Sequence, residues 1–228
     1  TRLGCEVTVA AEAGCCGALE HHLGKREAAL AAARRNIAAW EGFDAIVANA
    51  SGCGTQVKDY GFMLRDDSVW AARAAAVSAK ARDVTELVAE LGIAAEAAEA
   101  RFAKRTPQGL DVAYHSACSL AHGQKVTAEP RALLREAGFA VREIPEGHLC
   151  CGSAGSYNIL QPELAERLRA RKARNIATTG ADVVAAGNIG CMVQIAGAVA
   201  IPVVHTVELL DWATGGPRPQ ALSEGQTA

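Results

Sequence analysis

Cysteine is the residue type that could carry chemistry in this 228-residue sequence, which contains eight of them. Seven of the eight follow a pattern built on two Cys-Cys-Gly motifs, Cys15-Cys16-Gly17 and Cys150-Cys151-Gly152. A further cysteine follows each motif, at Cys53 and Cys191, and 31 residues separate Cys118 from the second motif. Thiolates are soft ligands, and four of them satisfy zinc or an iron–sulfur cluster. We therefore predict that these seven cysteines bind metal.

The spacing of the cysteines helps to separate the two metals. Structural zinc sites favour a C-x-x-C knuckle and bacterial ferredoxins use a C-x-x-C-x-x-C run, and the sequence contains neither. Adjacent cysteines cannot easily both ligate one small ion, but they can ligate different irons of a cluster. The glycine after each pair permits a backbone geometry that a side chain would hinder, and it lets amides approach sulfur. An iron–sulfur cluster is therefore favoured, with zinc as the alternative in one half.

The two halves of the chain repeat each other at an offset of 134 to 139 residues. The matching segments are 3–17 with 137–152, 34–38 with 173–177, and 44–53 with 182–191. A repeat of this length indicates a duplicated domain. The expected units are a first domain at 1–106, a second domain at 107–212 and a flexible tail at 213–228.

The repeat also predicts a missing cysteine. The offset places the first-half counterpart of Cys118 upstream of Thr1, so we expect the sequence to be a fragment whose first domain is N-terminally truncated. Cys5 does not replace it, because Cys5 aligns with Phe139 in a strand-like run and is expected to be a core thiol.

The elements that must position the cysteines are apolar strands alternating with helices. The expected strands are 7–11, 43–48, 110–114, 139–144 and 181–186, and the expected helices are 25–40, 68–80, 83–91 and 162–177. Asp83 and Glu86 form a capping box at the start of one helix. This alternation predicts an α/β fold in which each half has a mainly parallel sheet flanked by helices. Since ligands gather beyond the carboxyl ends of parallel strands, the cysteines of each half should converge at one sheet edge.

The composition argues against several classes of protein. Lysine plus arginine (23) nearly balances aspartate plus glutamate (25), and aromatic residues make up 4%. No nucleic-acid partner is expected, because such proteins need a basic face and stacking platforms. Residues 1–14 do not resemble a signal peptide. The apolar stretch 183–204 is interrupted by Asn188, Gln194 and Pro202, which argues against a membrane span. We predict a cytoplasmic protein with reduced thiols.

Other residue types give weaker signals. His115, His122 and His148 lie near the cysteines and are interpreted as loop histidines, while His205, at the end of a strand-like run, could support a metal site from behind its ligands. The basic segment 167–174 is interpreted as a solvated helix face. No G-x-G-x-x-G, P-loop or G-x-S-x-G motif is present. We therefore predict no catalytic residue in this chain and assign the substrate chemistry to a partner.

The motifs resemble the cysteine-rich CCG domain pair found in heterodisulfide reductase and in related iron–sulfur proteins. Within that family they are most similar to the C-terminal part of glycolate oxidase iron–sulfur subunits. The resemblance covers nearly the whole chain, up to about Trp212. The segments that carry it are 14–17, 51–54, 58–61, Tyr114-His115 with Cys118, 122–124, Pro130-Arg131, 150–158 and 188–191.

The resemblance implies a cluster held by cysteines in each half. The implied ligands are Cys118, Cys150, Cys151 and Cys191 in the second half, and Cys15, Cys16 and Cys53 in the first. The heterodisulfide reductase motif ends in C-x-x-C, where this chain has Gln56 and Gln194. A four-cysteine cluster of the [4Fe–4S] type is therefore implied, and not the five-cysteine noncubane cluster of that enzyme.

The resemblance further implies an oxidoreductase function, as the iron–sulfur electron-transfer subunit of a glycolate oxidase (glycolate dehydrogenase) complex. FAD-containing subunits would oxidise glycolate to glyoxylate, and an upstream ferredoxin-like domain of the same polypeptide would carry further clusters. Electrons would pass towards a membrane acceptor, with the protein in the cytoplasm or peripherally associated with the inner face of the membrane. The alternatives are a CCG-domain subunit of another flavin-linked oxidoreductase (lactate, glycerol 3-phosphate or heterodisulfide) and a structural zinc-binding assembly module.

Overall fold

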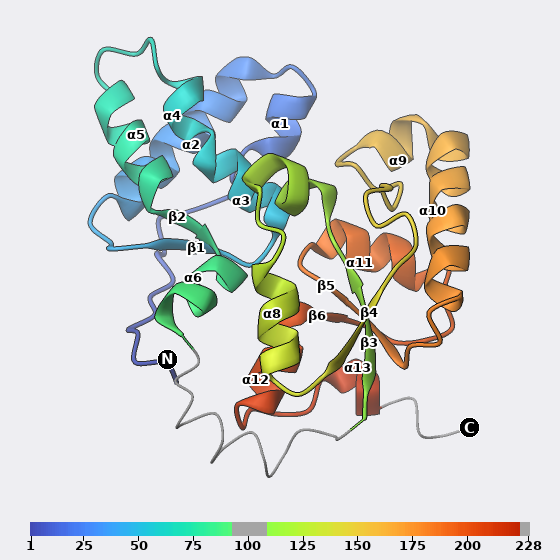
Figure 1. Cartoon of the computed structure of the whole chain (residues 1–228). Coiled ribbons are helices and arrows are strands. Elements are labelled where there is room, and N and C mark those ends of the chain that lie inside the picture. Colours follow the sequence, from blue (N-terminus) through green and yellow to red (C-terminus); the bar gives the residue numbers. More distant parts are fainter. Residues whose placement is uncertain (93–108, 224–228) are drawn as a thin grey trace.

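Two parallel sheets, one in each half of the chain, organise the computed structural model, which describes residues 1–92 and 109–223 (Figure 1). The first half has β1 (Ile46–Ala48) paired with β2 (Ala81–Asp83). The second half has a four-stranded sheet in the order β4-β3-β5-β6, with β3 at Asp111–His115, β4 at Ala140–Glu143, β5 at Val183–Ala186 and β6 at Val203–His205. All pairings are parallel, so the predicted α/β class is confirmed. The predicted domain boundary at 106/107 lies outside the described residues.

Helices follow the strands and flank both sheets. Those of the first half are α1 (Ala18–His22), α2 (Arg26–Trp40), α3 (Ser51–Lys58), α4 (Tyr60–Met63), α5 (Ala71–Lys80) and α6 (Val84–Leu91). Those of the second half are the π-helix η1 (Ser119–Gln124), α8 (Glu129–Glu136), α9 (Tyr157–Leu160), α10 (Pro162–Ala177), α11 (Ile189–Ala196), α12 (Thr206–Ala213) and α13 (Gln220–Ser223). The predicted capping box is present, because Asp83 accepts from the backbone of α6 and Glu86 accepts from the Asp83 amide.

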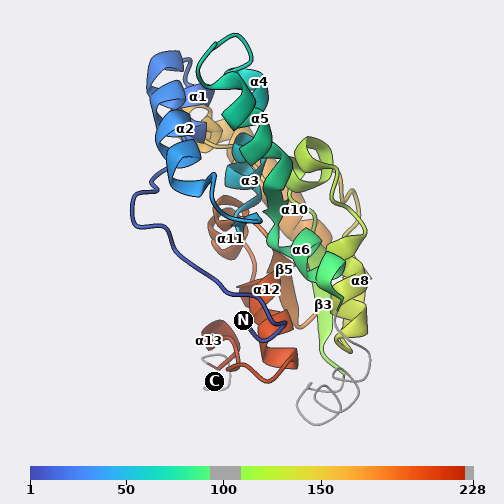
Figure 2. The same ribbon diagram turned by 90° about the vertical axis from the view of Figure 1, so that its left-hand side faces the viewer.

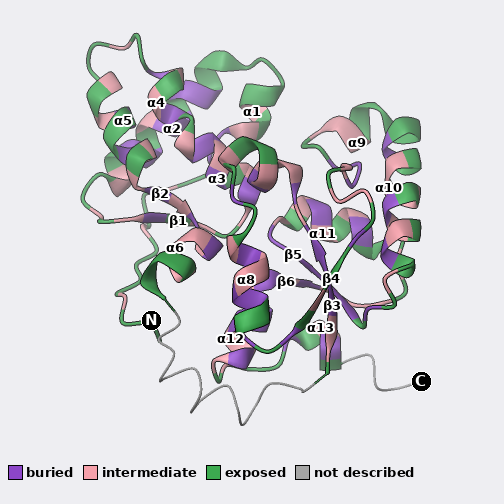
Figure 3. Ribbon diagram, in the orientation of Figure 1, coloured by how far each residue is buried: buried purple, intermediate pink, exposed green. Residues whose placement is uncertain are grey.

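Strand β3 sends alternate side chains to the two faces of the second sheet. Val112 and Tyr114 pack with residues of α8 and α12 in one buried cluster. Ala113 packs on the opposite face, in a cluster that includes residues of α10 and α11 together with Cys151 and Cys191. His115 follows Ala113 by two residues and therefore lies on the same face as these cysteines. Figure 3 shows β5 and most of β3 as buried, whereas the edge strand β4 is mostly exposed.

The strand expected at 7–11 is absent, and this prediction is wrong. Residues 5–10 have no regular structure, and Val7 and Val9 are 65% and 92% exposed. In Figure 2 this N-terminal segment runs alongside α12 before it reaches α1, and Arg2 donates to the Asp211 carbonyl. In the second half, the equivalent β4 forms by pairing with β3. The described part of the first half offers no strand in the place of β3, and an unpaired apolar run cannot form a sheet by itself.

The same segment corrects the interpretation of Cys5. The thiol is half-buried in irregular chain and belongs to none of the three buried clusters of the described residues, so Cys5 is not a core thiol. Phe139, with which it aligns, is 4% exposed and packs in the core of the second half. Cys5 and Phe139 thus align in sequence but differ in packing, because only Phe139 lies in a buried core.

The apolar stretch 183–204 folds as β5, α11 and part of β6. No helix in the described ranges is long and apolar enough to cross a membrane. Within the segment expected to form a tail, the structure has the short helix α13, whose Leu222 is buried against the second-half core. Residues 224–228 of that segment lie outside the described part of the chain.

A network of hydrogen bonds joins the two halves where α3 packs against η1 and the start of α11. The Ser51 amide donates to the Gly187 carbonyl (3.0 Å), and Asn188 Nδ2 donates to Ser51 Oγ (2.9 Å). Gln124 Nε2 donates to the Ser51 carbonyl (2.9 Å), and Ser51 Oγ lies 2.7 Å from Ser119 Oγ. The helices that carry Cys53 and Cys191 are thus fixed relative to each other.

His205 belongs to this junction and not to a metal site. Its Nδ1 accepts from the Val207 amide (3.0 Å) and caps α12, so Nε2 carries the proton. Nε2 lies 2.6 Å from the Asn49 carbonyl of the first half, to which it donates. Both ring nitrogens are used in holding the halves together, which leaves neither of them for support of a metal ligand.

Candidate metal centre

The four second-half cysteines follow three neighbouring strands of one sheet. Cys118 comes after β3 as the N-cap of η1, Cys150 and Cys151 lie in the loop after β4, and Cys191 lies in the first turn of α11 after β5. Because β4, β3 and β5 are adjacent and parallel, their carboxyl ends meet at one edge. Cys151 and Cys191 are buried, while Cys118 and Cys150 are half-buried. The predicted convergence of these cysteines is present in the structure.

The four thiols contact one another in the order Cys118, Cys150, Cys151, Cys191. The pKa of Cys150 lies far below its usual range because of hydrogen bonds with Cys118 and then Cys151. The same contacts raise the pKa of Cys118 and of Cys151. Hydrogen bonding with Cys151 lowers the pKa of Cys191 to about 6, against the effect of burial. The contacts among the thiols thus favour the thiolate form of Cys150 and Cys191, and the thiolate is the form of cysteine that binds metal.

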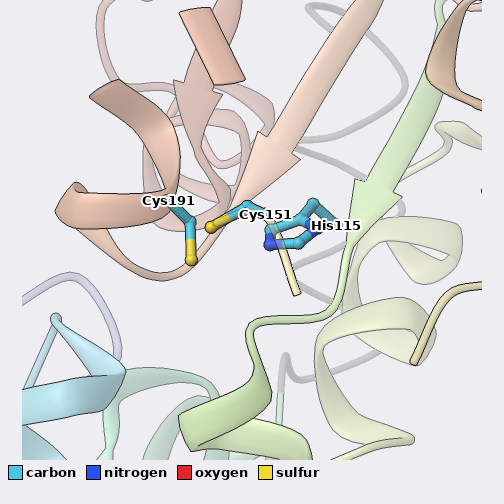
Figure 4. Close-up of side chains that lie close together, drawn as sticks. All are labelled: His115, Cys151 and Cys191. Atoms are coloured by element: carbon cyan, nitrogen blue, oxygen red, sulfur yellow. The ribbon is translucent and has the colours of Figure 1, made fainter. Parts of the chain in front are cut away.

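His115 joins this group, although its position in the sequence suggested a loop histidine with satisfied hydrogen bonds. It ends β3, is 1% exposed, and neither ring nitrogen has an aligned hydrogen-bond partner among the described residues. Its ring nitrogen and the sulfurs of Cys151 and Cys191 all lie within 4.8 Å of one another, and Figure 4 shows the three side chains side by side. A buried imidazole without a partner is costly, and a metal or a sulfide would supply the partner. The alternation of side chains along β3 could have predicted this position from the sequence, because alternate residues of a strand share one face of the sheet.

The start of α11 is built to aim Cys191. Asn188 is its N-cap, and Asn188 Oδ1 accepts from the amides of Gly190 (2.9 Å) and Cys191 (3.3 Å). Asparagine is among the strongest N-caps because its side chain satisfies the free amides of the first turn. The positive end of the helix dipole also favours a thiolate there. Cys53 occupies the same place in α3, the third helical residue.

The glycine of the second motif has a demanding conformation. Gly152 has φ +93°, and a Cβ at this position would lie 2.3 Å from the Ala165 carbonyl oxygen of α10. Its amide donates to Cys150 Sγ over 3.3 Å. Gly17 has φ +80°, and a Cβ there would lie 3.1 Å from Ala32 Cβ of α2. The motif glycines thus let each cysteine loop approach the following long helix.

The first half brings Cys15, Cys16 and Cys53 together in a more open setting. Cys16 is 8% exposed, whereas Cys15 and Cys53 are exposed. Hydrogen bonding with Cys16 lowers the pKa of Cys53 to about 7, and the same contact raises the pKa of Cys16. Three thiols therefore come together, two from the first Cys-Cys-Gly motif and one from the first turn of α3.

Two asparagines of the repeated Arg-Asn-Ile-Ala segment anchor the chain near each motif. Asn36 Oδ1 accepts from the Gly14 amide (2.9 Å), and Asn36 Nδ2 donates to the Cys15 carbonyl and to the Tyr60 hydroxyl, each over 3.0 Å. Its counterpart Asn175 donates to the Pro145 carbonyl (2.9 Å) in the second half. The repeat marked these residues, but only the structure assigns them this anchoring role.

Replacement of Asn36 by alanine is expected to destabilise the chain by about 2–3 kcal/mol, because Asn36 is fully buried and its loss leaves polar groups near Cys15 unpaired. The free energy of unfolding in urea measures this. Asn175→Ala is the matched control, with an expected loss of about 1 kcal/mol because Asn175 is half-buried and water can replace it. Equal losses in both variants would contradict the anchoring role of Asn36.

The remaining candidates lie on the surface or in helices. His148 is exposed in a turn, as expected of a loop histidine, whereas His122 is exposed but lies in the π-helix η1 and not in a loop. The basic segment 167–174 is only in part a solvated face, because Lys172 within it is fully buried.

The second-half site fits a sulfur-ligated centre. The ligand atoms of His115, Cys151 and Cys191 lie within 4.8 Å of one another, and Cys150, whose sulfur accepts from the Gly152 amide, and Cys118 extend this group. Such a donor set suits an iron–sulfur cluster, whose sulfurs accept hydrogen bonds, and it also suits zinc.

Comparison with known proteins agrees with this chemistry. The family model described as "Cysteine-rich domain" (CCG) matches residues 1–58 and 112–196. The chain is 41% identical over 217 residues to the glycolate oxidase iron-sulfur subunit of Escherichia coli (strain K12), covering 93% of the chain and 51% of that protein. It is 35% identical over 195 residues to the probable glycolate oxidase iron-sulfur subunit of Bacillus subtilis (strain 168), covering 84% of the chain and 43% of that protein.

A third relative differs in name and in length. Lactate utilization protein A of Bacillus licheniformis is 28% identical over 216 residues, covering 92% of the chain and 88% of that protein. The chain thus spans about half the length of the two glycolate oxidase relatives and most of the lactate utilization relative. With both Cys-Cys-Gly motifs inside the matched residues, the chain belongs to the CCG cysteine-rich domain family.

Proposed function

We propose that this chain is part of the iron–sulfur subunit of a flavin-linked oxidoreductase and that it transfers electrons without binding the organic substrate. The observation that carries the proposal is the convergence of four thiols and an unpartnered buried imidazole at one sheet edge. The printed names of the first two relatives, which are iron–sulfur subunits, support it.

The proposed ligands are Cys118, Cys150, Cys151 and Cys191 for a [4Fe–4S] centre in the second half, with Cys15, Cys16 and Cys53 contributing to a centre in the first. When bound, a cluster of this type supplies one-electron transfer. The protein itself presents the thiolates from rigid strand ends and helix starts, donates the Gly152 amide to sulfur, and shields Cys151 and Cys191 from water.

The surface near both cysteine groups suits electron exchange with a partner. Exposed apolar side chains occur on the elements that follow or carry the cysteines: Leu19, Leu23, Ile159, Leu160, Ile189 and Val193. The loop that follows the second motif also approaches α1 of the first half, because a Cβ on Gly155 would lie 3.5 Å from the His22 ring. Apolar surface of this kind is typical of protein interfaces.

We further propose that glycolate, oxidised to glyoxylate on FAD-containing partner subunits, is the electron source. An upstream ferredoxin-like domain and a peripherally bound membrane acceptor belong to the same proposal. Glycolate is favoured over lactate because the glycolate oxidase relatives are more similar in sequence, at 41% and 35% identity against 28%. Mixing the loaded protein with reduced glycolate- or lactate-oxidising flavoproteins tests this: faster bleaching by the lactate enzyme would contradict glycolate as the source.

A structural zinc module is the second candidate. The ligand atoms of His115, Cys151 and Cys191 lie within 4.8 Å of one another, and ligands of a single ion at metal–sulfur distances of about 2.3 Å cannot lie much further apart than this. In that case the chain would hold a redox-silent ion and serve assembly.

Metal and acid-labile sulfide content of the anaerobically purified protein separates the two candidates. We expect iron and sulfide in equal amounts, at about four of each per loaded half, as a cubane requires. Zinc without sulfide would overturn the electron-transfer function.

A further inference from the structure

Lys172 is a fully buried lysine on the helix α10 that flanks the second-half thiols. Its exposed fraction is 0%, and its Nζ donates one hydrogen bond, to the Glu146 carbonyl oxygen at 3.2 Å. No ion pair with a carboxylate is formed by Lys172 within the described ranges. A buried ammonium without a counter-charge is strongly unfavourable, so a negative charge close to Lys172 is needed to offset the cost of its burial.

The carboxylate of Glu146 supplies only part of that charge. The Glu146 side chain is bound by Arg171, which donates to both carboxylate oxygens, and by Asn175 Nδ2 at 2.9 Å. Its charge is therefore already matched by the Arg171 guanidinium.

The thiols supply the remainder. Lys172 lies on the same face of α10 as Ala165, whose carbonyl oxygen approaches Gly152, and Ile176, which packs in the buried cluster of Cys151 and Cys191, so this face of the helix covers the thiols. Burial lowers the pKa of Lys172, and the neighbouring cysteines, as thiolates, oppose that shift. A centre held by four thiolates is net negative with zinc or with a cubane cluster, and so it provides the counter-charge that the lysine lacks.

The buried lysine occurs in the second half and has no counterpart at the equivalent position of the first half. In the register that aligns Arg174-Asn175 with Arg35-Asn36, Lys172 corresponds to Ala33 of α2, which is also 0% exposed. The duplicated fold therefore accepts a small apolar residue at this place. A lysine is not required by the packing of the repeat, which points to a role in charge.

We propose that the Lys172 ammonium is a fixed positive charge that stabilises the reduced, more negative form of the second-half centre and so raises its reduction potential. The inference rests on the proposed function, because it requires a redox-active centre on these cysteines. Net charge close to a cluster is one of the factors that set its potential, and a charge in a buried site is screened little by solvent. Lys172 thus acts on the centre through its charge and does not bind it as a ligand.

The test is an anaerobic redox titration of the iron-loaded protein, followed by visible absorption and electron paramagnetic resonance. The second-half signal is identified as the one that Cys151→Ser removes. In Lys172→Gln, which keeps an N–H donor for the Glu146 carbonyl, we expect the reduction equilibrium constant to fall about tenfold, a negative shift of about 59 mV for a one-electron couple. Lys172→Met, an uncharged chain of similar length, is expected to shift the potential in the same direction by a similar amount.

The matched control is Arg174→Gln, which removes an exposed cation from the same helix and is expected to leave the potential unchanged because water screens it. If iron-loaded Lys172→Gln has the wild-type potential, the proposed charge effect of Lys172 is wrong, while the proposed function stands. This holds even if the potential of Lys172→Met is shifted, because the hydrogen bond to the Glu146 carbonyl, and not the charge, would then set the potential. Zinc without iron in the wild type would overturn the proposed function itself. Iron content therefore distinguishes the two failures.

Discussion

Replacing Cys151 by serine is expected to remove the second-half metal centre while the chain stays folded. Cys151 is 1% exposed and contacts both Cys150 and Cys191, so it lies in the middle of the thiol group. Loss of residues that merely support a ligand costs about 10–100-fold in metal affinity, and loss of a ligand should cost more than about 100-fold. Iron per chain and the charge-transfer absorption of the second-half centre are the measurements.

The control for this experiment is Cys5→Ser. Cys5 is half-buried in irregular chain and lies outside the buried clusters, so its replacement should leave both iron content and absorption unchanged. Cys151→Ala serves as a second variant, since alanine brings no hydroxyl into the buried site. Both Cys151 variants are expected to retain the helix content measured by far-ultraviolet circular dichroism. Unchanged absorption in folded Cys151→Ser would show that Cys151 is not a ligand.

The second large effect is expected from Gly152→Ala. Two costs combine there: φ of +93° is unfavourable for a residue with a side chain, and the added Cβ would meet the Ala165 backbone oxygen at 2.3 Å. Helix backbone cannot yield as a flexible side chain does, so either the first turn of α10 or the cysteine loop must move. We expect a loss of about 3–5 kcal/mol in the free energy of unfolding. We also expect a loss of metal, because the Gly152 amide no longer reaches Cys150 Sγ.

Gly180→Ala separates backbone strain from the close approach. Gly180 has φ +63°, but a Cβ there would meet nothing within 4 Å. Only the cost of the left-handed conformation applies, about 1–2 kcal/mol, and the metal content should not change. If Gly152→Ala proved no more destabilising than Gly180→Ala, the contact between the motif and α10 would not be what requires glycine.

The sequence alone predicted several local features of the fold, although β2 and helices such as α3, α8 and α11 were missed. Apolar runs predicted β1, β3, β4 and β5 close to their observed places, and helical periodicity predicted α10 at its observed bounds. Asp83 and Glu86 predicted the cap of α6. These signals succeed because periodicity and capping depend on residues within a few positions of one another. The strand order then accounts for the meeting of the second-half cysteines at one sheet edge, because the carboxyl ends of adjacent parallel strands lie together.

The tertiary structure decided everything that depends on a distant partner. The apolar run at 7–11 is no strand, because strands need a neighbour to pair with. His205 looked like a supporting residue of a metal site and instead joins the halves through the Asn49 carbonyl.

His115 and Lys172 show the same limit for the candidate site. The burial of a histidine or a lysine cannot be predicted from its residue type, and Lys172 lies in a basic segment that has the pattern of a solvated face. Their environment is created when α10 and β3 pack around the cysteine loops, from positions far apart in the chain. The sequence therefore determined which side chains could bind metal, and only the packing decided which charges and unpaired groups surround them, because burial and electrostatic environment are properties of contacts between distant segments.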